Sequence, residues 1–185
     1  MTQPLRILFM SHAADDPNGG ASRIYHMLTA ALQARGHAVD LYHLKDFGLP
    51  ATPAAAKLAA RFALPRYVSR FGAKRDLKHY DIVMSSSGMT APLFRSLLPQ
   101  KNRPGLVNHL HGLSVYDHVA NVIENELGHF RTSFGYRLVT GPFQNRWDLA
   151  GIRSADLTIV QNLRDLSWAQ PRVPAGAEVR MIPAA

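Results

Sequence analysis

The chain has 185 residues, of which 46% are hydrophobic and 18% are charged, and it contains no cysteine. This length suits one domain with a sizeable core, and the composition is too apolar for a disordered chain. The lack of cysteine excludes disulfide bridges and thiolate chemistry. Because no apolar run reaches the roughly 18 residues that span a bilayer, and no hydrophobic signal segment follows the start of the chain, we expect a cytoplasmic protein.

The formal net charge of +8 is concentrated in one stretch of the chain. Residues 53–80 hold seven basic side chains and one acidic side chain, and Pro65 predicts a division of this stretch into two helices. Four of its basic residues follow one another at four-residue steps, namely Arg66, Arg70, Lys74 and Lys78. Such a stretch can bind an anionic membrane surface, or it can be a solvated helix face above a core-facing stripe.

The first third of the chain predicts a strand, a helix and a second strand. The apolar run at 5–10 indicates a buried strand, and the region 38–44 predicts the next one. Between them, Ser22 is expected to cap a helix over 22–35, and Gly36 is expected to end it. The helix is predicted to turn an apolar stripe inward, made of Ile24, Met27, Leu28, Ala31 and Leu32.

The same rhythm continues downstream. Further strands are predicted at 81–84, 105–110, 156–160 and 179–182. Thr90 is expected to cap a helix that ends at Leu98, and Asn162 is expected to cap a short helix before Pro171. Repeated strand–helix–strand units favour an α/β fold over residues 1–185, a Rossmann-like doubly wound, mainly parallel sheet of about six strands with helices on both faces. Ligands of such sheets bind beyond the carboxyl ends of the strands.

Two loops at these carboxyl ends are candidate binding sites. Gly19 and Gly20 lie before the first helix, where backbone N–H groups favour a phosphate, although a tight turn with positive φ would also explain them. The sequence has neither a G-x-G-x-x-G fingerprint nor a P-loop, which argues against an ordinary dehydrogenase or NTPase. The hydroxyl-rich loop 85–90 could bind a sugar or phosphate, or it could form a serine-rich turn. The sequence contains no G-x-S-x-G nucleophile elbow, which argues against a hydrolase.

A pair of histidines marks the end of the fourth strand. Alternation places His109 and His111 on the same side, and Gly112 follows them. An imidazole ring at this position can act as a hydrogen-bond donor or as a base near pH 7. Alternatively, it can be hydrogen-bonded to the backbone and have no chemical role. With His118 a metal site could be imagined, but no carboxylate or thiolate stands at a familiar ligand spacing, so we expect no metal.

The segments RILFMSHA, NGGASR, IYHMLTAALQARGH, AVDLYHL, NHLHG, SADLTIVQN and VRMIPAA, taken in order, resemble the N-terminal domain of a family 4 glycosyltransferase of the GT-B architecture. The resemblance covers essentially the whole chain. It implies an acceptor-side half, with the C-terminal donor-binding domain absent from this chain, so the chain alone is expected to be inactive. The implied reaction is transfer of a sugar, with retention of configuration, from a nucleotide-sugar donor to a glycan or lipid-linked acceptor, with no cofactor and no metal.

The resemblance also implies roles for individual residues. Gly19 and Gly20 would approach the donor diphosphate, and His111 would lie at the reacting sugar and orient hydroxyl groups. Further neighbours of the cleft would be Arg23, Ser87, Tyr116 and Asn162. The basic stretch would dock the enzyme at the inner face of the cytoplasmic membrane.

Two other functions are consistent with the sequence. One is a stand-alone Rossmann-like module that binds a nucleotide or an anionic lipid without catalysis. The other is a nucleic-acid-binding protein, which we do not expect because no known nucleic-acid module is visible and the basic residues are confined to one stretch.

Overall fold

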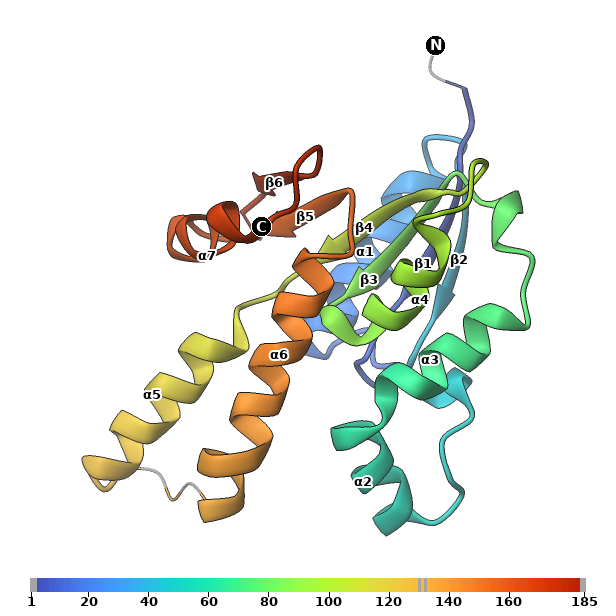
Figure 1. Cartoon of the computed structure of the whole chain (residues 1–185). Coiled ribbons are helices and arrows are strands. Elements are labelled where there is room, and N and C mark those ends of the chain that lie inside the picture. Colours follow the sequence, from blue (N-terminus) through green and yellow to red (C-terminus); the bar gives the residue numbers. More distant parts are fainter. Residues whose placement is uncertain (1–2, 130, 132, 184–185) are drawn as a thin grey trace.

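Six parallel strands form one sheet in the computed structural model, which describes residues 3–129, 131 and 133–183 (Figure 1). The strands are β1 (Arg6–Met10), β2 (Ala38–Tyr42), β3 (Ile82–Ser86), β4 (Gly105–His109), β5 (Leu157–Val160) and β6 (Glu178–Met181). Their order is β2-β1-β3-β4-β5-β6, and every neighbouring pair is parallel. All six predicted strands and the predicted fold class are therefore confirmed. Residues 1–2 and 184–185, which belong to the predictions about the two chain ends, lie outside the described residues.

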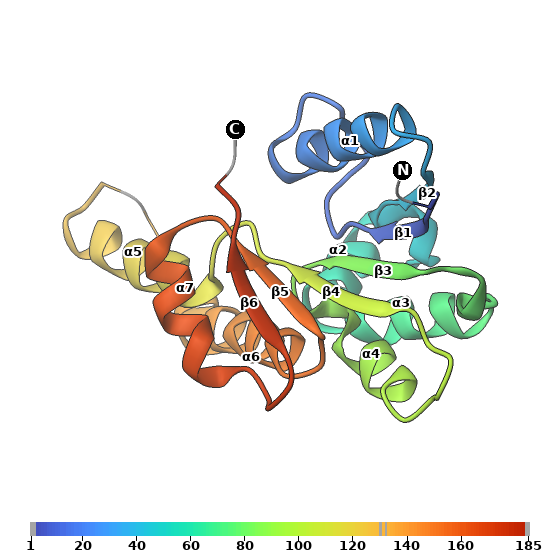
Figure 2. The ribbon, with the colours of Figure 1, turned by 90° about the horizontal axis from the view of Figure 1, so that it is seen from above.

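Helices cover both faces of this sheet. They are α1 (Gly20–Gln33), α2 (Pro53–Phe62), α3 (Leu64–Ala73), α4 (Ala91–Leu97), α5 (Ser114–Glu126), α6 (Gly141–Ile152) and α7 (Leu163–Ala169). Right-handed crossovers place α1 alone on one face, because only the step from β1 to β2 runs toward that edge of the sheet. Figure 2 shows α1 above the strands and α4 and α6 below them.

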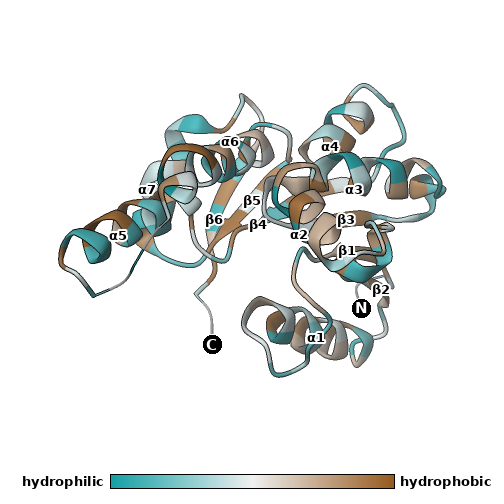
Figure 3. Ribbon diagram, turned by 90° about the horizontal axis from the view of Figure 1, so that it is seen from below, coloured by the Kyte–Doolittle hydropathy of each residue, from teal (hydrophilic) through white to brown (hydrophobic). Residues whose placement is uncertain are grey.

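The core lies on both sides of β1. Ile7 and Phe9 face α1 and pack around Tyr25, whereas Leu8 and Met10 point to the opposite side and join the cluster under α3 and α4. This alternation explains why β1 reads as an unbroken apolar run, since both of its faces are covered. In Figure 3 the central strands are largely brown, while the helices carry both hydrophobic and hydrophilic segments.

Helix α1 differs from its prediction at its start and along its stripe. Gly19 is the residue before the helix, and Ser22 lies inside the first turn with its Oγ accepting the Asp16 backbone N–H at 3.2 Å. The prediction of Ser22 as a cap is therefore wrong, because its hydroxyl serves the preceding loop. Met27 belongs to the predicted inward stripe but is 55% exposed. It lines an apolar groove between α1 and β5 and is not packed against β1.

The other helix boundaries show where local signals suffice. The Asn162 side chain accepts the Asp165 backbone N–H at 2.8 Å, which confirms that cap. The division at Pro65 is confirmed too, because α2 ends at Phe62 and Pro65 stands in the first turn of α3. Thr90 precedes α4 but makes no side-chain cap, because the chain enters α4 from a 3₁₀ turn over Gly88–Thr90 whose carbonyls accept the first N–H groups. The prediction of a Thr90 cap is wrong.

Helices α5 and α6, for which the sequence analysis made no prediction, lie side by side and project beyond the sheet (Figure 1). A side-chain carbon on Gly88 would overlap the backbone carbonyl of Trp147, so this glycine allows α6 to lie directly on the turn after β3. Among the described residues, no helix combines the length and the apolar character needed to cross a membrane.

Candidate functional site

A cavity of about 460 Å³ lies between α2 and α6 at the carboxyl edge of the sheet. Its floor comes from the residues that follow three parallel strands: His12 after β1, Ser87 after β3 and Ser114 after β4. Ligand pockets have volumes of about 300–1,000 Å³, and in open α/β sheets they lie at this edge. The cavity therefore has the size and the place of a binding site.

Ser87 has the most unusual backbone in this cavity. Its φ of 77° and ψ of 177° fall in a region that is essentially restricted to glycine, and among the described residues it alone has positive φ without being glycine. Its N–H donates to the His109 carbonyl at 3.1 Å, and its carbonyl accepts the Ser85 hydroxyl at 3.0 Å. Such a conformation costs about 1–3 kcal/mol and is concentrated at functional sites.

Asp148 of α6 is the buried acid of the cavity. Its side chain is 4% exposed and accepts the Ser114 backbone N–H at 2.8 Å, which caps α5 from outside that helix. Burial raises the pKa of Asp148 to about 6. The sequence analysis missed Asp148, since only tertiary packing brings α6 to the start of α5.

Basic side chains of α2 line the opposite wall. Lys57 and Arg61 are exposed at the cavity, and within the described part of the chain neither forms an ion pair. They give the rim a positive charge that faces the single carboxylate of Asp148.

The basic residues of α3 lie apart from the cavity. Arg66, Arg70 and Lys74 form an exposed strip along α3, here called the α3 basic face, and Lys78 follows in a short 3₁₀ turn over Leu77–His79. The apolar side of α3 is buried in the core through Leu64, Val68 and Phe71. No apolar side of α3 is left for insertion into a bilayer, so this face offers charge alone.

His111 lies on the α1 side of the same edge. Its ring makes an edge contact with Tyr25 at 5.3 Å between centroids, and its Nδ1 lies 3.0 Å from the amide nitrogen of Gln161. Because an amide nitrogen can only donate, the proton of the neutral ring is placed on Nε2, which is buried and has no partner. Burial lowers the pKa of His111 to about 3, so the ring is a neutral donor at pH 7.

Neighbouring histidines have different surroundings. His109 packs against His111 at 4.3 Å between ring centroids, which confirms that the two share a side. His118 lies instead on α5 near Gly141 and Tyr136. In the described ranges no metal-type group joins these three histidines.

His12 connects the two sides of the edge. Its ring Nδ1 lies 2.7 Å from Ser86 Oγ, and its backbone N–H donates to the same oxygen at 2.9 Å. It lines the cavity, and a positive charge on it would further lower the pKa of His111. The sequence analysis did not select His12 or Gln161, although each is a polar residue directly beyond the carboxyl end of a strand.

The glycine loop stands at the open start of α1. The Gly19 N–H donates to the Asp16 carbonyl at 3.0 Å and closes a turn, so the turn of the alternative interpretation is present. Its expected positive φ is wrong, because Gly19 is extended, with φ of −88° and ψ of 120°, and Gly20 has no positive φ either. A side-chain carbon on Gly20 would meet nothing within 4 Å. The first turn of α1 has no side-chain cap and no acidic residue, and Arg23 is exposed there. The Asp16 side chain lies against Gly19, and the Gly19 N–H already donates to the Asp16 carbonyl, so an anion would bind at the N–H groups that follow Gly19.

Two further candidates from the sequence lie elsewhere, at the contact between α5 and α7. Arg164 stacks 3.6 Å above the Tyr116 ring, and the Tyr116 hydroxyl donates to the Arg164 carbonyl at 3.5 Å. The Asn162 side chain is occupied by Asp165 through both its oxygen and its nitrogen. Thus Ser87 lies in the cavity, the glycines and His111 lie on the α1 side, and Tyr116 and Asn162 line neither place.

Neither protein-family models nor curated proteins match this sequence. Among solved structures, the chain is similar to sucrose-phosphate synthase from Thermosynechococcus elongatus, with a TM-score of 0.64 and 19% identity over 97% of this chain and 48% of that one. A second structure of that synthase gives a TM-score of 0.54 and 16% identity over 97% of this chain and 89% of that one.

A UDP-glucosyltransferase from Polygonum tinctorium, capable of glucosylating indoxyl, aligns with a TM-score of 0.48 and 9% identity over 100% of this chain and 52% of that one. The chain thus spans about half the length of the first synthase structure. The synthase similarities establish the fold, a Rossmann-like α/β sheet.

Proposed function

We propose that this chain is the acceptor-side part of a retaining glycosyltransferase, which moves a sugar from a nucleotide-sugar donor to an acceptor hydroxyl. The observation that carries the proposal is the carboxyl-edge cavity, which is lined by the strained Ser87 and the buried Asp148. The uncapped start of α1 follows β1 at the same edge of the sheet, on its opposite face. The fold shared with GT-B glycosyltransferases supports it.

On the donor side, the start of α1 receives the diphosphate. Backbone N–H groups at a helix start stabilise negative charge, and this charge grows as the diphosphate departs from the sugar. Gly20 lets the phosphate oxygens approach, because it leaves open space where a side chain would stand, whereas Gly19 contacts the Asp16 side chain on that side. Arg23 adds a positive charge one turn into the helix. His111 is placed at the reacting sugar in this scheme, and because its Nε2–H is buried, a hydrogen bond to a sugar hydroxyl requires this edge of the sheet to open around the ring.

On the acceptor side, the cavity binds the group that receives the sugar. Asp148 accepts a hydrogen bond from an acceptor hydroxyl, while Lys57 and Arg61 favour an acceptor that carries a negative charge. The phosphate of a lipid-linked glycan meets both requirements. The α3 basic face would then hold the protein at an anionic membrane surface by charge alone.

The remaining donor contacts belong to a second domain outside this chain. Half a cleft holds the nucleotide weakly, so the 185-residue chain alone binds a nucleotide sugar poorly and transfers nothing. The transfer itself needs no metal ion in this scheme, because the helix start and basic side chains balance the diphosphate charge.

The test begins with the mass of the protein in its native cell. A product near twice 20.5 kDa supports the acceptor-half assignment, and that full polypeptide is then assayed with labelled nucleotide sugars and lipid extracts. His111→Ala is expected to lower transfer by about 100-fold or more. His79→Ala, at an exposed position outside the cavity, is the matched control and should be neutral.

Two results would contradict parts of the proposal. Unchanged turnover in His111→Ala removes His111 from the reacting centre. A native product of 20.5 kDa that binds nucleotides or anionic lipids but transfers no sugar replaces the enzyme with a stand-alone binding module.

A further inference from the structure

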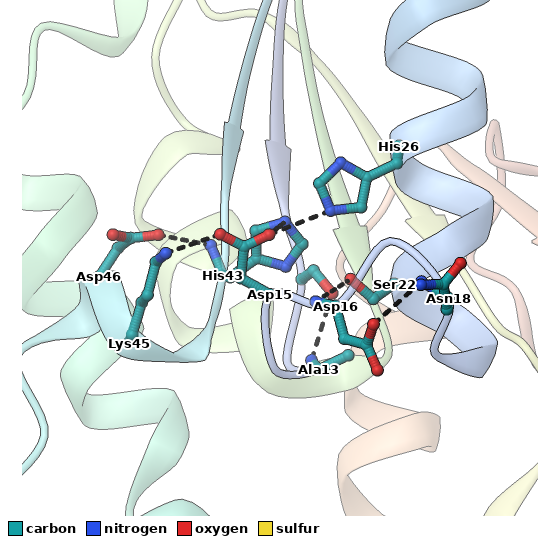
Figure 4. Close-up of polar contacts among 10 residues, drawn as sticks. Ala13, Asp15, Asp16, Asn18, Ser22, His26, His43, Lys45 and Asp46 are labelled. Atoms are coloured by element: carbon teal, nitrogen blue, oxygen red, sulfur yellow. Dashed lines mark hydrogen bonds and ion pairs between the residues drawn. The ribbon is translucent and has the colours of Figure 1, made fainter.

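Three potential metal ligands meet at the carboxyl ends of β1 and β2, away from the cavity (Figure 4). Asp15 lies in the loop after β1, His26 stands in α1, and His43 directly follows β2. His26 Nε2 lies 3.0 Å from Asp15 Oδ1, and His43 Nε2 lies 3.3 Å from the same oxygen. All three ligand atoms are within 4.8 Å of one another.

His43 is the buried member of this cluster. It is 3% exposed, its Nε2 lies 3.3 Å from Asp15 Oδ1, and its ring also has a backbone hydrogen bond with Ala13. These contacts hold the ring with its Nε2 directed at the carboxylate. The His26 and His43 rings are stacked at 5.1 Å, and Figure 4 shows both directed toward Asp15.

The donor atoms of these side chains suit a cation. Each histidine offers an imidazole nitrogen, and Asp15 offers a carboxylate oxygen. Two neutral imidazoles and one carboxylate form a donor set that suits zinc.

We propose that Asp15, His26 and His43 bind one divalent transition-metal ion, with Zn²⁺ as the best fit, through the two Nε2 atoms and Asp15 Oδ1. Ligands about 2.0–2.1 Å from a tetrahedral zinc ion are separated by about 3.4 Å from one another, and the two distances to Asp15 Oδ1 lie close to this value. A fourth position is left for water. Mg²⁺, which prefers oxygen ligands, should bind poorly.

Lys45 makes this site distinctive. Its Nζ lies 2.6 Å from Asp15 Oδ2, so it occupies the oxygen that the metal does not use and keeps the carboxylate monodentate. Its charge also opposes a second cation nearby. Removing this charge should therefore tighten metal binding, whereas a network that only holds the loop in place would be weakened by the same change.

The metal would fasten the loop before Gly19 to both α1 and β2. This proposal does not depend on sugar transfer, because it concerns only residues of this chain and is tested with the metal alone.

The experiment titrates Zn²⁺ into the metal-free 185-residue chain by calorimetry, with Mg²⁺ as the comparison ion. We expect one Zn²⁺ per chain, with affinity lowered by about tenfold or more in Asp15→Asn and in His26→Gln. His79→Gln is the matched control, because His79 pairs with Asp76 at 2.8 Å on the surface without a second histidine. Its affinity should equal that of the parent.

Lys45→Met provides an independent readout, because Lys45 is largely exposed and its loss should not disturb folding. We expect this variant to bind Zn²⁺ roughly threefold more tightly or better. The proposal is overturned if the parent shows no saturable binding of one Zn²⁺, if Asp15→Asn and His26→Gln bind like the parent, or if Lys45→Met binds more weakly. Circular dichroism on each variant separates loss of ligands from loss of fold.

Discussion

Replacing Ser87 with glycine should stabilise the protein, which is unusual for a change inside a candidate site. The Ser87 backbone, at φ 77° and ψ 177°, stores about 1–3 kcal/mol that glycine would release. Glycine gains about 0.4–1 kcal/mol of entropy in the unfolded chain, which opposes this gain. The Ser87 hydroxyl makes no hydrogen bond within the described residues, so little else is lost. The net gain is about 1 kcal/mol.

For a chain of this length, that gain raises the melting temperature by about 2–4 °C. Calorimetry on the parent, Ser87→Gly and Ser87→Ala provides the test. Alanine keeps the strain, so Ser87→Ala should melt close to the parent and serves as the control. A Ser87→Gly protein that melts at or below the parent would refute the strain argument. If the hydroxyl contacts a ligand, both variants should lose transfer in the full polypeptide, although only one gains stability.

Three further results are expected. Because the pKa of Asp148 is raised to about 6, the unfolded state releases this proton first, and the stability of Asp148→Asn relative to the parent should rise by about 2 kcal/mol from pH 4 to pH 6, as measured by urea unfolding at each pH. Gly88→Ala should cost several kcal/mol in urea, because its new carbon overlaps the Trp147 carbonyl, while Gly20→Ala should be nearly neutral. Charge reversal of the α3 basic face should weaken sedimentation with anionic liposomes. If the variant and the parent sediment equally, the α3 basic face is an ordinary solvated helix face.

The strands could be predicted because their signal is local. β1 is apolar on both faces, and a run of that kind is sufficient to place a buried parallel strand. Caps were predicted less well, since Asn162 caps α7 whereas Ser22 and Thr90 cap nothing. A hydroxyl cap depends on where the preceding loop runs, and both hydroxyl residues follow loops whose own hydrogen bonds take precedence.

The site was only partly predictable for a different reason. Ser87 and His111 could be selected because each follows the carboxyl end of a strand, and in a parallel α/β sheet ligands bind at that edge. Asp148 lies in the middle of α6, and it reaches the cavity because Gly88 and Gly151 allow close packing around that helix. The sequence does not show which segment packs against either glycine. Tyr116 was selected because the family resemblance implies a cleft neighbour there, but a stacked arginine holds it against α7 instead.

The strain at Ser87 follows from the hydrogen bonds that hold the end of β3 to the residues after β1 and to the end of β4. Ser86 pairs with His109 in the β3–β4 register, and its Oγ and carbonyl lie 2.7 Å and 3.1 Å from His12 Nδ1. The next N–H must still reach the His109 carbonyl to complete the ladder. Because Ser86 is held by His12 and the Ser87 N–H is held by the His109 carbonyl, the Ser87 backbone adopts a conformation that glycine fits better. Because Ser87 lines the cavity together with His12, this strained position is the one at which a functional role for the hydroxyl can be tested separately from stability.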